Sequence, residues 1–346
     1  MRSKNSTNVR LLIPQFYRIF LAGLARISTG LAAALAERLF FSVPRRPESE
    51  GEARMLASAR RYQFELGGRR VVAWRWGDGP TALLVHGWGG SAAQMLPFVE
   101  PLRGAGYSVV AFDAPAHGHS EGRTSSLPEF AASLSAVAGK LGPVEVLVTH
   151  SMGGAAASLA IAQGLAVGRA VYVAPPADAL EWVYRFGRML RLPRKVVEAM
   201  RRRAERRLHV RFDRLNTRVL GPAVRMPLLV IHDRADAEVL WYDGAAVAHS
   251  VPNGRLTMTE GLGHRRILRD PGVVAEAVKF LVDKDSTREL PEGTEAGVCA
   301  GCGDPLSWQA ESSMEVCEMC ALERELFDRE LRWEHEVEGI AMGARR

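Results

Sequence analysis

The chain has 346 residues, of which 47% are hydrophobic and 24% are charged, and its formal net charge is +6. This length allows one large domain and a small additional module, and a net charge this small gives no reason to expect binding to nucleic acid. All four cysteines fall within residues 299–320, which excludes a disulfide scaffold for the rest of the chain.

The first predicted element is a helix over residues 15–40, ended before Pro44. Arg18, Arg26 and Glu37 interrupt its apolar run, so it lacks the roughly 20 uncharged residues that a membrane span needs. We expect an amphipathic helix that packs on the body of the protein or lies on a membrane surface, and packing is the preferred interpretation. A cleaved signal peptide is the third interpretation, but it would place the cysteines in an oxidising compartment.

Strands and helices then alternate along most of the chain. Strands are expected at residues 61–66, 71–76, 82–85, 108–112, 144–149, 170–174, 228–231 and 255–259. Helices are expected at residues 92–102, 127–141, 155–163, 239–248 and 273–282. This alternation predicts a doubly wound, mostly parallel sheet with helices on both faces. Gly67 and Gly68 predict a hairpin between the first two strands.

Residues 178–226 interrupt the alternation. They contain no clear strand and hold fourteen Arg or Lys against five Asp or Glu. The pattern predicts two or three basic helices separated by Pro193 and again near Gly221. Because this segment is inserted between two strands of the sheet, we expect a helical cap over the carboxyl ends of the strands.

The central motif is Val146-Leu-Val-Thr-His-Ser-Met-Gly-Gly154, in which a buried strand turns sharply into a helix around Ser151. This pattern is typical of a nucleophile elbow. Gly153 would let the helix pass close behind the serine, and the N–H of Met152 would point to where an oxyanion forms. Thr149 stands where the usual G-x-S-x-G motif has its first glycine.

Four further loops follow the order of a known family. They are His86-Gly-Trp-Gly-Gly90, Asp113-Ala-Pro-Ala-His-Gly-His-Ser120, Ile231-His-Asp-Arg-Ala-Asp236 and Glu260-Gly-Leu-Gly-His264. With the serine elbow they resemble the α/β-hydrolase fold superfamily over roughly residues 60–284, and in particular its serine esterase, lipase and thioesterase branches.

The resemblance implies a Ser-His-Asp triad. Ser151 matches the nucleophile and His264 matches the base, while two aspartates compete for the role of the acid. Asp236 holds the position that the acid usually takes in the family, and Asp233 is the alternative, otherwise a residue that forms the turn. In such a triad the acid fixes the tautomer of the histidine, which accepts the proton of the serine.

The implied activity is cleavage of a small-molecule carboxylic ester or thioester through an acyl-enzyme intermediate, with no cofactor in catalysis. The N–H groups of Trp88 and Met152 would form the oxyanion hole. A serine at the elbow argues against dehalogenases and epoxide hydrolases, whose nucleophile is a carboxylate. The alternative is a catalytically silent scaffold with a hydrolase fold that works through its C-terminal module.

That module carries Cys299, Cys302, Cys317 and Cys320 in a Cys-x-x-Cys…Cys-x-x-Cys arrangement. The spacing is typical of a zinc-ribbon-like site in which four thiolates hold a structural Zn²⁺, and a redox dithiol is the alternative. Residues 286–346 hold fourteen Asp or Glu against six Arg, which opposes binding to nucleic acid. We expect the module to contact the basic cap or a protein partner.

The sequence therefore predicts three parts. Residues 1–50 form an N-terminal amphipathic helix and linker, residues 55–285 form an α/β-hydrolase domain that includes the cap, and residues 286–346 form the four-cysteine module with an acidic helix. Reduced thiolates favour a cytoplasmic location, with peripheral contact to a membrane through the N-terminal helix as a further possibility.

Overall fold

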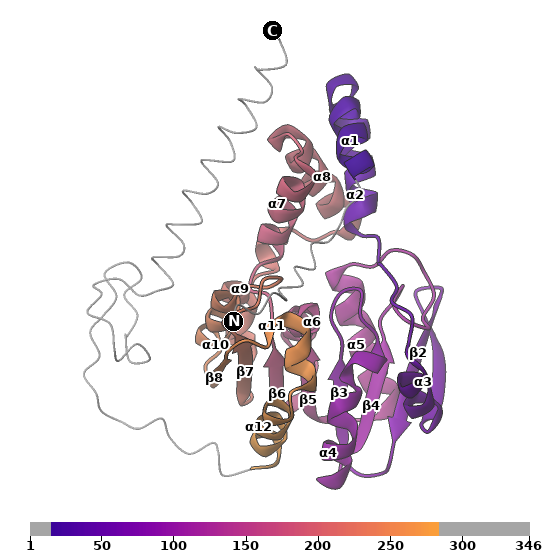
Figure 1. Cartoon of the computed structure of the whole chain (residues 1–346), viewed down its shortest axis with the longest axis vertical. Helices are drawn as coiled ribbons and strands as arrows, with labels where there is room; N and C mark the ends of the chain where they lie inside the picture. The colour runs from indigo at the N-terminus through magenta and orange to yellow at the C-terminus, as the bar shows by residue number, and fades with distance from the viewer. Residues whose placement is uncertain (1–14, 284–346) are drawn as a thin grey trace, which may run out of the picture.

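A computed structural model describes residues 15–283, and an eight-stranded sheet forms the centre of that part of the chain (Figure 1). The strand order is β1-β2-β4-β3-β5-β6-β7-β8. The strands are β1 Arg60–Leu66, β2 Arg69–Trp76, β3 Thr81–Val85, β4 Ser108–Asp113, β5 Val144–His150, β6 Val167–Val173, β7 Leu228–Asp233 and β8 Gly254–Thr259. The pairs β1–β2 and β2–β4 are antiparallel, and all the other neighbours are parallel. The mostly parallel sheet predicted from the sequence is confirmed.

Each face of the sheet is covered by its own hydrophobic layer. In β3, Leu83 and Val85 belong to one layer, and Ala82 and Leu84 belong to the other. The first layer lies beneath α5 Leu127–Leu141, α6 Met152–Ala162 and α10 Trp241–Ser250. The second lies beneath α3 Glu50–Ala57, η1 Ala92–Phe98, α4 Val99–Gly104 and α12 Pro271–Val282. Strands β3, β4 and β7 are thus buried on both faces throughout, which explains their continuous apolar runs, whereas the edge strands β1 and β8 are partly exposed.

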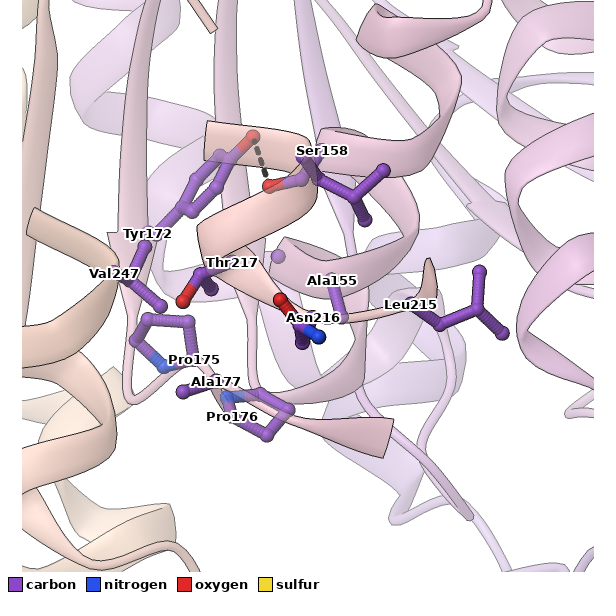
Figure 2. Close-up of a pocket in the computed structure, with 12 residues that line it drawn as sticks. Ala155, Ser158, Tyr172, Pro175, Pro176, Ala177, Leu215, Asn216, Thr217 and Val247 are labelled. Carbon is purple, nitrogen blue, oxygen red and sulfur yellow. Dashed lines mark hydrogen bonds between the residues drawn. The ribbon is translucent and has the colours of Figure 1, made fainter. Parts of the chain in front are cut away.

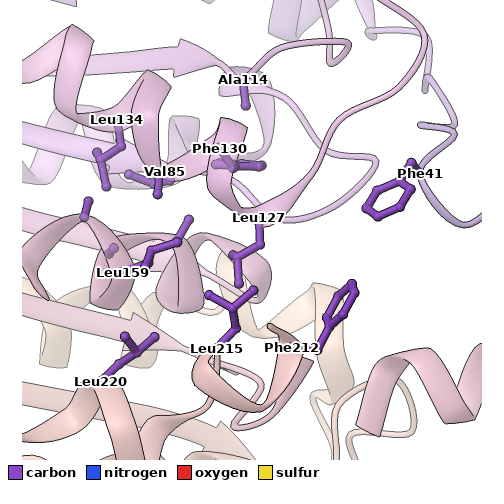
Figure 3. Close-up of a cluster of buried hydrophobic side chains, with 14 of the residues drawn as sticks. Phe41, Val85, Ala114, Leu127, Phe130, Leu134, Leu159, Phe212, Leu215 and Leu220 are labelled. Atoms are coloured by element: carbon purple, nitrogen blue, oxygen red, sulfur yellow. The ribbon is translucent and has the colours of Figure 1, made fainter. Parts of the chain in front are cut away.

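The cap begins with two helices, α7 Ala179–Leu190 and α8 Arg194–Leu208, which are separated at Pro193 as predicted. Three short helical turns then return the chain to the sheet: η2 Phe212–Arg214, α9 Thr217–Leu220 and η3 Gly221–Ala223. Phe212, Leu215 and Leu220 from this returning segment extend the first hydrophobic layer (Figure 3). The cap is therefore joined to the sheet by a continuous apolar core.

The helix predicted over residues 15–40 is a pair of helices, α1 Gln15–Ile27 and α2 Thr29–Phe40. Ser28 separates them because its side chain caps α2, accepting a hydrogen bond from Leu31 N at 3.3 Å. Helix α2 packs along α8, and α1 packs on α2 and α7. Within residues 15–283, none of the helices combines the length and the apolarity that a bilayer span requires.

Charged groups hold α2 against the cap. Glu37 is 6% exposed, and its carboxylate lies 2.8 Å from Arg203 Nε and 2.7 Å from Arg207 Nε. The guanidinium of Arg207 also lies over the ring of Phe41 at 4.5 Å. The N-terminal helices and the first two cap helices therefore form one cluster of packed helices.

Two predicted segments differ locally in the structure. The linker expected to close residues 1–50 ends at Ser49, because α3 begins at Glu50 with a capping box between Ser49 and Glu52. The helix expected over residues 92–102 begins as the 3-10 helix η1 and becomes an α-helix only at Val99. Pro97 lacks the backbone N–H that an α-helix would need at that position.

The four-cysteine module, with its predicted zinc site and acidic helix, lies outside the described residues.

Candidate active site

Ser151 lies at the turn between β5 and α6, with φ 51° and ψ −126°. A non-glycine residue in this conformation is strained, so the surrounding structure must hold it in place. Two hydrogen bonds do so: Ser151 N donates to Val173 O, and Gly154 N donates to Ser151 O, each at 2.9 Å. The side chain is partly exposed, as a nucleophile must be.

Two glycines allow α6 to start directly behind this turn. A Cβ atom on Gly153 would lie 2.7 Å from His86 O and 2.8 Å from Val85 O, closer than such atoms can approach. A Cβ on Gly154 would lie 3.3 Å from Thr149 Oγ1. The absence of a side chain at residue 154 thus makes room for Thr149, which replaces the usual first glycine of the motif.

His264 and Asp236 meet at the carboxyl end of the sheet. The Nδ1 atom of His264 lies 2.7 Å from Asp236 Oδ2, and the two residues are 9% and 3% exposed. Because an ionised carboxylate only accepts hydrogen bonds, Nδ1 carries the proton in the neutral imidazole, and Nε2 can then accept one. Asp236 Oδ1 accepts from the N–H groups of Glu238 at 2.8 Å and Val239 at 2.9 Å.

These contacts keep Asp236 charged. Burial alone would raise the pKa of its carboxyl, but hydrogen bonds from His232 and His264 and the charge on His264 outweigh burial and leave the pKa well below the usual range. His232 Nε2 lies 3.4 Å from Asp236 Oδ2 and 3.0 Å from Val239 O. Both carboxylate oxygens of Asp236 are therefore held by neighbouring groups, Oδ1 by backbone N–H groups and Oδ2 by the two imidazoles.

Asp233, the alternative acid, has a different set of partners. Its carboxylate accepts hydrogen bonds from Leu262 N at 3.0 Å, Gly263 N at 2.9 Å and the Thr259 hydroxyl at 2.8 Å. Burial would raise the pKa of this carboxyl, but the backbone hydrogen bonds lower it overall. Asp233 thus anchors the loop that carries His264, whereas Asp236 contacts the imidazole itself.

His150, immediately before Ser151, also contacts the histidine loop. Its Nε2 lies 2.9 Å from the backbone oxygen of His264, and the two imidazole rings are 4.6 Å apart. Burial lowers the pKa of His150 to about 3, so the ring is neutral and its Nε2–H donates to the His264 carbonyl. No role was predicted for His150 from the sequence, where its position next to the serine was the one available signal.

His86 fixes the loop proposed for the oxyanion hole. Its Nδ1–H donates to Gly87 O at 2.7 Å, and its Nε2 accepts from Ala114 N at 3.0 Å. Burial lowers the pKa of His86, which agrees with a neutral ring. Gly90 N also donates to Gly87 O, at 3.1 Å. Because a trans peptide is planar, fixing this carbonyl also fixes the Trp88 N–H, which points in the opposite direction.

The loop that holds this N–H lies directly against the elbow. A Cβ atom on Gly87 would be 2.9 Å from Ser151 Cβ and 3.1 Å from His150 Nδ1. Met152, the second predicted donor, is the first residue of α6, so its N–H has no carbonyl of its own helix to bind. The two predicted donors therefore belong to segments that adjoin the serine.

A family model described as the alpha/beta hydrolase family matches residues 82–277, more than half of the chain. The chain belongs to the alpha/beta hydrolase family. Among solved structures, an esterase of Pyrococcus furiosus is similar with a TM-score of 0.53 and 22% identity, over 69% of this chain and 98% of that chain. A thioesterase domain from the curacin biosynthetic pathway has a TM-score of 0.51 and 17% identity, over 65% of this chain and 100% of that chain.

Two further similarities cover different parts of the chain. A bacterial membrane phospholipase A has a TM-score of 0.52 and 18% identity, over 80% of this chain and 100% of that chain. The dihydrolipoyllysine-residue acetyltransferase component of an acetoin cleaving system from Cupriavidus necator is 40% identical over 111 residues, which cover 30% of this chain and 29% of that protein. The chain thus matches less than a third of the length of that relative.

A cavity behind the elbow lies on the side of α6 that faces α9 and α10 (Figure 2). Its volume of about 10 Å³ leaves room for about one water molecule. Ser158 and Tyr172 face each other in its wall, with their hydroxyl oxygens 3.5 Å apart. The cavity is too small to hold an acyl chain, and it adjoins the first two turns of α6 rather than Ser151 itself.

Among residues 15–283, no three His, Cys, Asp or Glu side chains form a cluster that could hold a metal ion.

Proposed function

We propose that this hydrolase-family chain is a serine hydrolase that cleaves a carboxylic ester or thioester through Ser151, His264 and Asp236. The observation that carries the proposal is the 2.7 Å hydrogen bond between His264 and Asp236, beside a serine held at φ 51°. A serine on a strained turn and a histidine oriented by a carboxylate are two of the requirements of nucleophilic catalysis.

In the proposed reaction, Ser151 Oγ attacks the carbonyl carbon and its proton passes to His264 Nε2. The negative charge that develops on the carbonyl oxygen is stabilised by the N–H groups of Trp88 and Met152. The tetrahedral intermediate then breaks the bond to the alcohol or thiol, which leaves with the proton from His264. Water attacks the acyl-enzyme in the same way and releases the carboxylic acid, restoring Ser151.

The charges around the site suit this sequence of steps. The ionised Asp236 stabilises the imidazolium that forms when His264 takes the proton. The nearby His150 stays neutral, since its pKa is about 3, and therefore adds no positive charge to oppose that protonation. Asp236 remains a carboxylate throughout.

Replacement of Ser151 provides the test. In Ser151→Ala and in His264→Ala, hydrolysis of a p-nitrophenyl ester and of an acyl thioester is expected to fall by about a thousandfold or more. Ser158→Ala is the matched control, because Ser158 lies on the same helix at the small cavity, and it should keep its activity. Full activity in purified Ser151→Ala would contradict the proposal and favour the silent scaffold.

A further inference from the structure

The N-terminal helices expose an unusual number of large apolar side chains. Five of the seven such side chains in the described residues lie within residues 16–31. They form the N-terminal apolar face, which consists of Phe16 at 67% exposure, Ile19 at 66%, Phe20 at 48%, Ile27 at 84% and Leu31 at 60%. Exposed apolar side chains gathered in this way mark an interaction surface.

This face is distinct from the surface by which α1 packs on the cap. Leu21 and Ala25 are buried at the packed side, where α1 meets α2 and α7. Residues 16, 20 and 27 lie within about 40° of one another around a helix of 3.6 residues per turn, on the opposite side from Leu21 and Ala25. Helix α1 is therefore apolar on two sides, and only one of them is covered within residues 15–283.

The described residues near the N-terminal apolar face carry an excess of positive charge. Residues 15–36 include no Asp or Glu, and Arg26 is exposed. Helix α8, which packs beside α2, carries seven Arg or Lys against two Glu. Its Lys195, Arg202 and Arg206 are exposed. A partner that fits this surface must therefore offer apolar groups to the exposed apolar side chains and anionic groups to the neighbouring basic residues.

A second copy of the chain fits poorly. Two copies related by a twofold axis would bring the same basic residues of each copy toward one another, and like charges repel. A lipid surface with anionic headgroups meets both requirements. Its acyl chains accept the apolar side chains, and its headgroups neutralise the basic residues. Figure 1 places α1 and the α1–α2 turn at the end of the cap cluster away from the sheet, where they can reach a flat surface.

We propose that the N-terminal apolar face docks this protein on anionic phospholipid bilayers. The phenylalanine, isoleucine and leucine side chains enter the boundary between headgroups and acyl chains while α1 lies in the plane of the surface. The surrounding arginines and lysines bind the headgroups. The proposal is independent of the activity at Ser151, since it requires no turnover.

Cosedimentation of the full chain with vesicles tests the proposal. The protein should bind vesicles of phosphatidylcholine with 30% phosphatidylglycerol about tenfold or more tightly than vesicles of phosphatidylcholine alone, and added salt should weaken the difference. The variant Phe16→Ser/Ile19→Ser/Ile27→Ser should lose about tenfold or more of this binding, because each side chain contributes buried apolar area in the bilayer. These three side chains are mostly exposed, so the fold should be retained.

The matched control is Val219→Ser/Val282→Ser, which removes the two exposed apolar side chains that lie elsewhere, at 43% and 44% exposure. It should bind vesicles as the unaltered protein does. Failure of the full chain to bind anionic vesicles would overturn the proposal. A triple variant that binds vesicles normally but dissociates a dimer, as measured by light scattering, would overturn it in favour of a second copy.

Discussion

At the scale of single residues, two aspartates at the end of β7 have separate roles around His264. Asp236 contacts the imidazole, whereas Asp233 binds the backbone of the loop that delivers it. The difference follows from their positions: Asp233 ends the strand and faces the neighbouring loop after β8, while Asp236 lies one turn further on. The same substitution should therefore have different effects at the two sites.

We expect Asp236→Asn to reduce kcat by several orders of magnitude with little loss of stability, because the amide no longer fixes the tautomer or charge of His264. Asp233→Asn should instead lower the free energy of unfolding by about 1–3 kcal/mol, because Leu262 N and Gly263 N donate to different carboxylate oxygens and the NH₂ group that replaces one oxygen cannot accept. Ester hydrolysis and urea unfolding of both variants check this. A stable but inactive Asp233→Asn beside an active Asp236→Asn would reverse the assignment.

His86 offers a test of the oxyanion loop. His86→Phe keeps a ring of similar size but removes both hydrogen bonds, so the Gly87–Trp88 peptide is no longer fixed from that side. We expect kcat to fall by about tenfold or more while KM changes little, because the oxyanion forms only in the transition state. Steady-state kinetics on a p-nitrophenyl ester separate the two constants. A fall in stability with unchanged kcat would limit His86 to a structural role.

The candidate site could be predicted only in part from the sequence. Ser151, Asp236 and His264 were predicted to form the triad because each follows a strand in the order of a known family. The supporting contacts could not be identified in this way, since His150 and His264 are 114 positions apart and the bond between them joins a side chain to a backbone oxygen. Such contacts depend on loop geometry that periodicity does not encode.

At the scale of elements, the long periodic segments were predicted best. Helix α5 was expected at residues 127–141 and begins and ends there, because Ser126 caps its start and Gly142 follows its end. The break between α1 and α2 was missed, since the apolar pattern continues through Ser28 and only the capping hydrogen bond stops the helix. Capping residues thus determine where these helices begin and end, which hydrophobic periodicity alone does not specify.

Helix α10 carries a pH-dependent contact with the start of the cap. Asp243 accepts a hydrogen bond from Ala177 N at 3.3 Å. Although part of the residue is exposed, burial of its carboxyl raises the pKa from 3.8 to about 7. The folded state therefore holds this proton more tightly than the unfolded chain, and the associated stability is full below pH 3.8, declines as the pH rises and is lost above about 7.

Asp243→Asn should accordingly stabilise the protein more at pH 8 than at pH 5. The amide imitates the protonated acid at every pH and can still accept from Ala177 N, so its advantage grows as the carboxyl of the unaltered protein is forced to ionise. Thermal unfolding of both proteins at the two pH values measures the effect. An equal difference in Tm at pH 5 and pH 8 would show that Asp243 is not the titrating group.

At the scale of the whole molecule, the sequence predicted the hydrolase fold and favoured packing of the N-terminal segment on the body, but it did not show which elements that segment packs against. Their apolar side chains face two directions, so the pattern was compatible with packing and with a lipid surface. The structure shows which side of the N-terminal helices packs on the protein, because the contacts of Glu37 with Arg203 and Arg207 join α2 to α8. Contacts of this kind link segments 166 and more positions apart and leave no local trace in the sequence.

The four-cysteine module remains a prediction. The purified full chain should contain about one zinc ion per molecule, as measured by elemental analysis, because four thiolates at this spacing form a closed tetrahedral site. Cys299→Ser/Cys302→Ser should remove the metal. Ester hydrolysis at Ser151 should persist in that variant, since the proposed mechanism routes no step through a metal. A metal-free full chain with reduced cysteines would contradict the zinc site.

The most direct test of the proposed mechanism is labelling of the full chain with a fluorophosphonate, followed by peptide mass spectrometry. These reagents phosphorylate a serine that a neighbouring histidine has activated and leave ordinary serines unmodified. We predict one stoichiometric adduct on Ser151, which is lost in His264→Ala although the serine is still present. No adduct, or one on a different serine, would contradict the proposed mechanism.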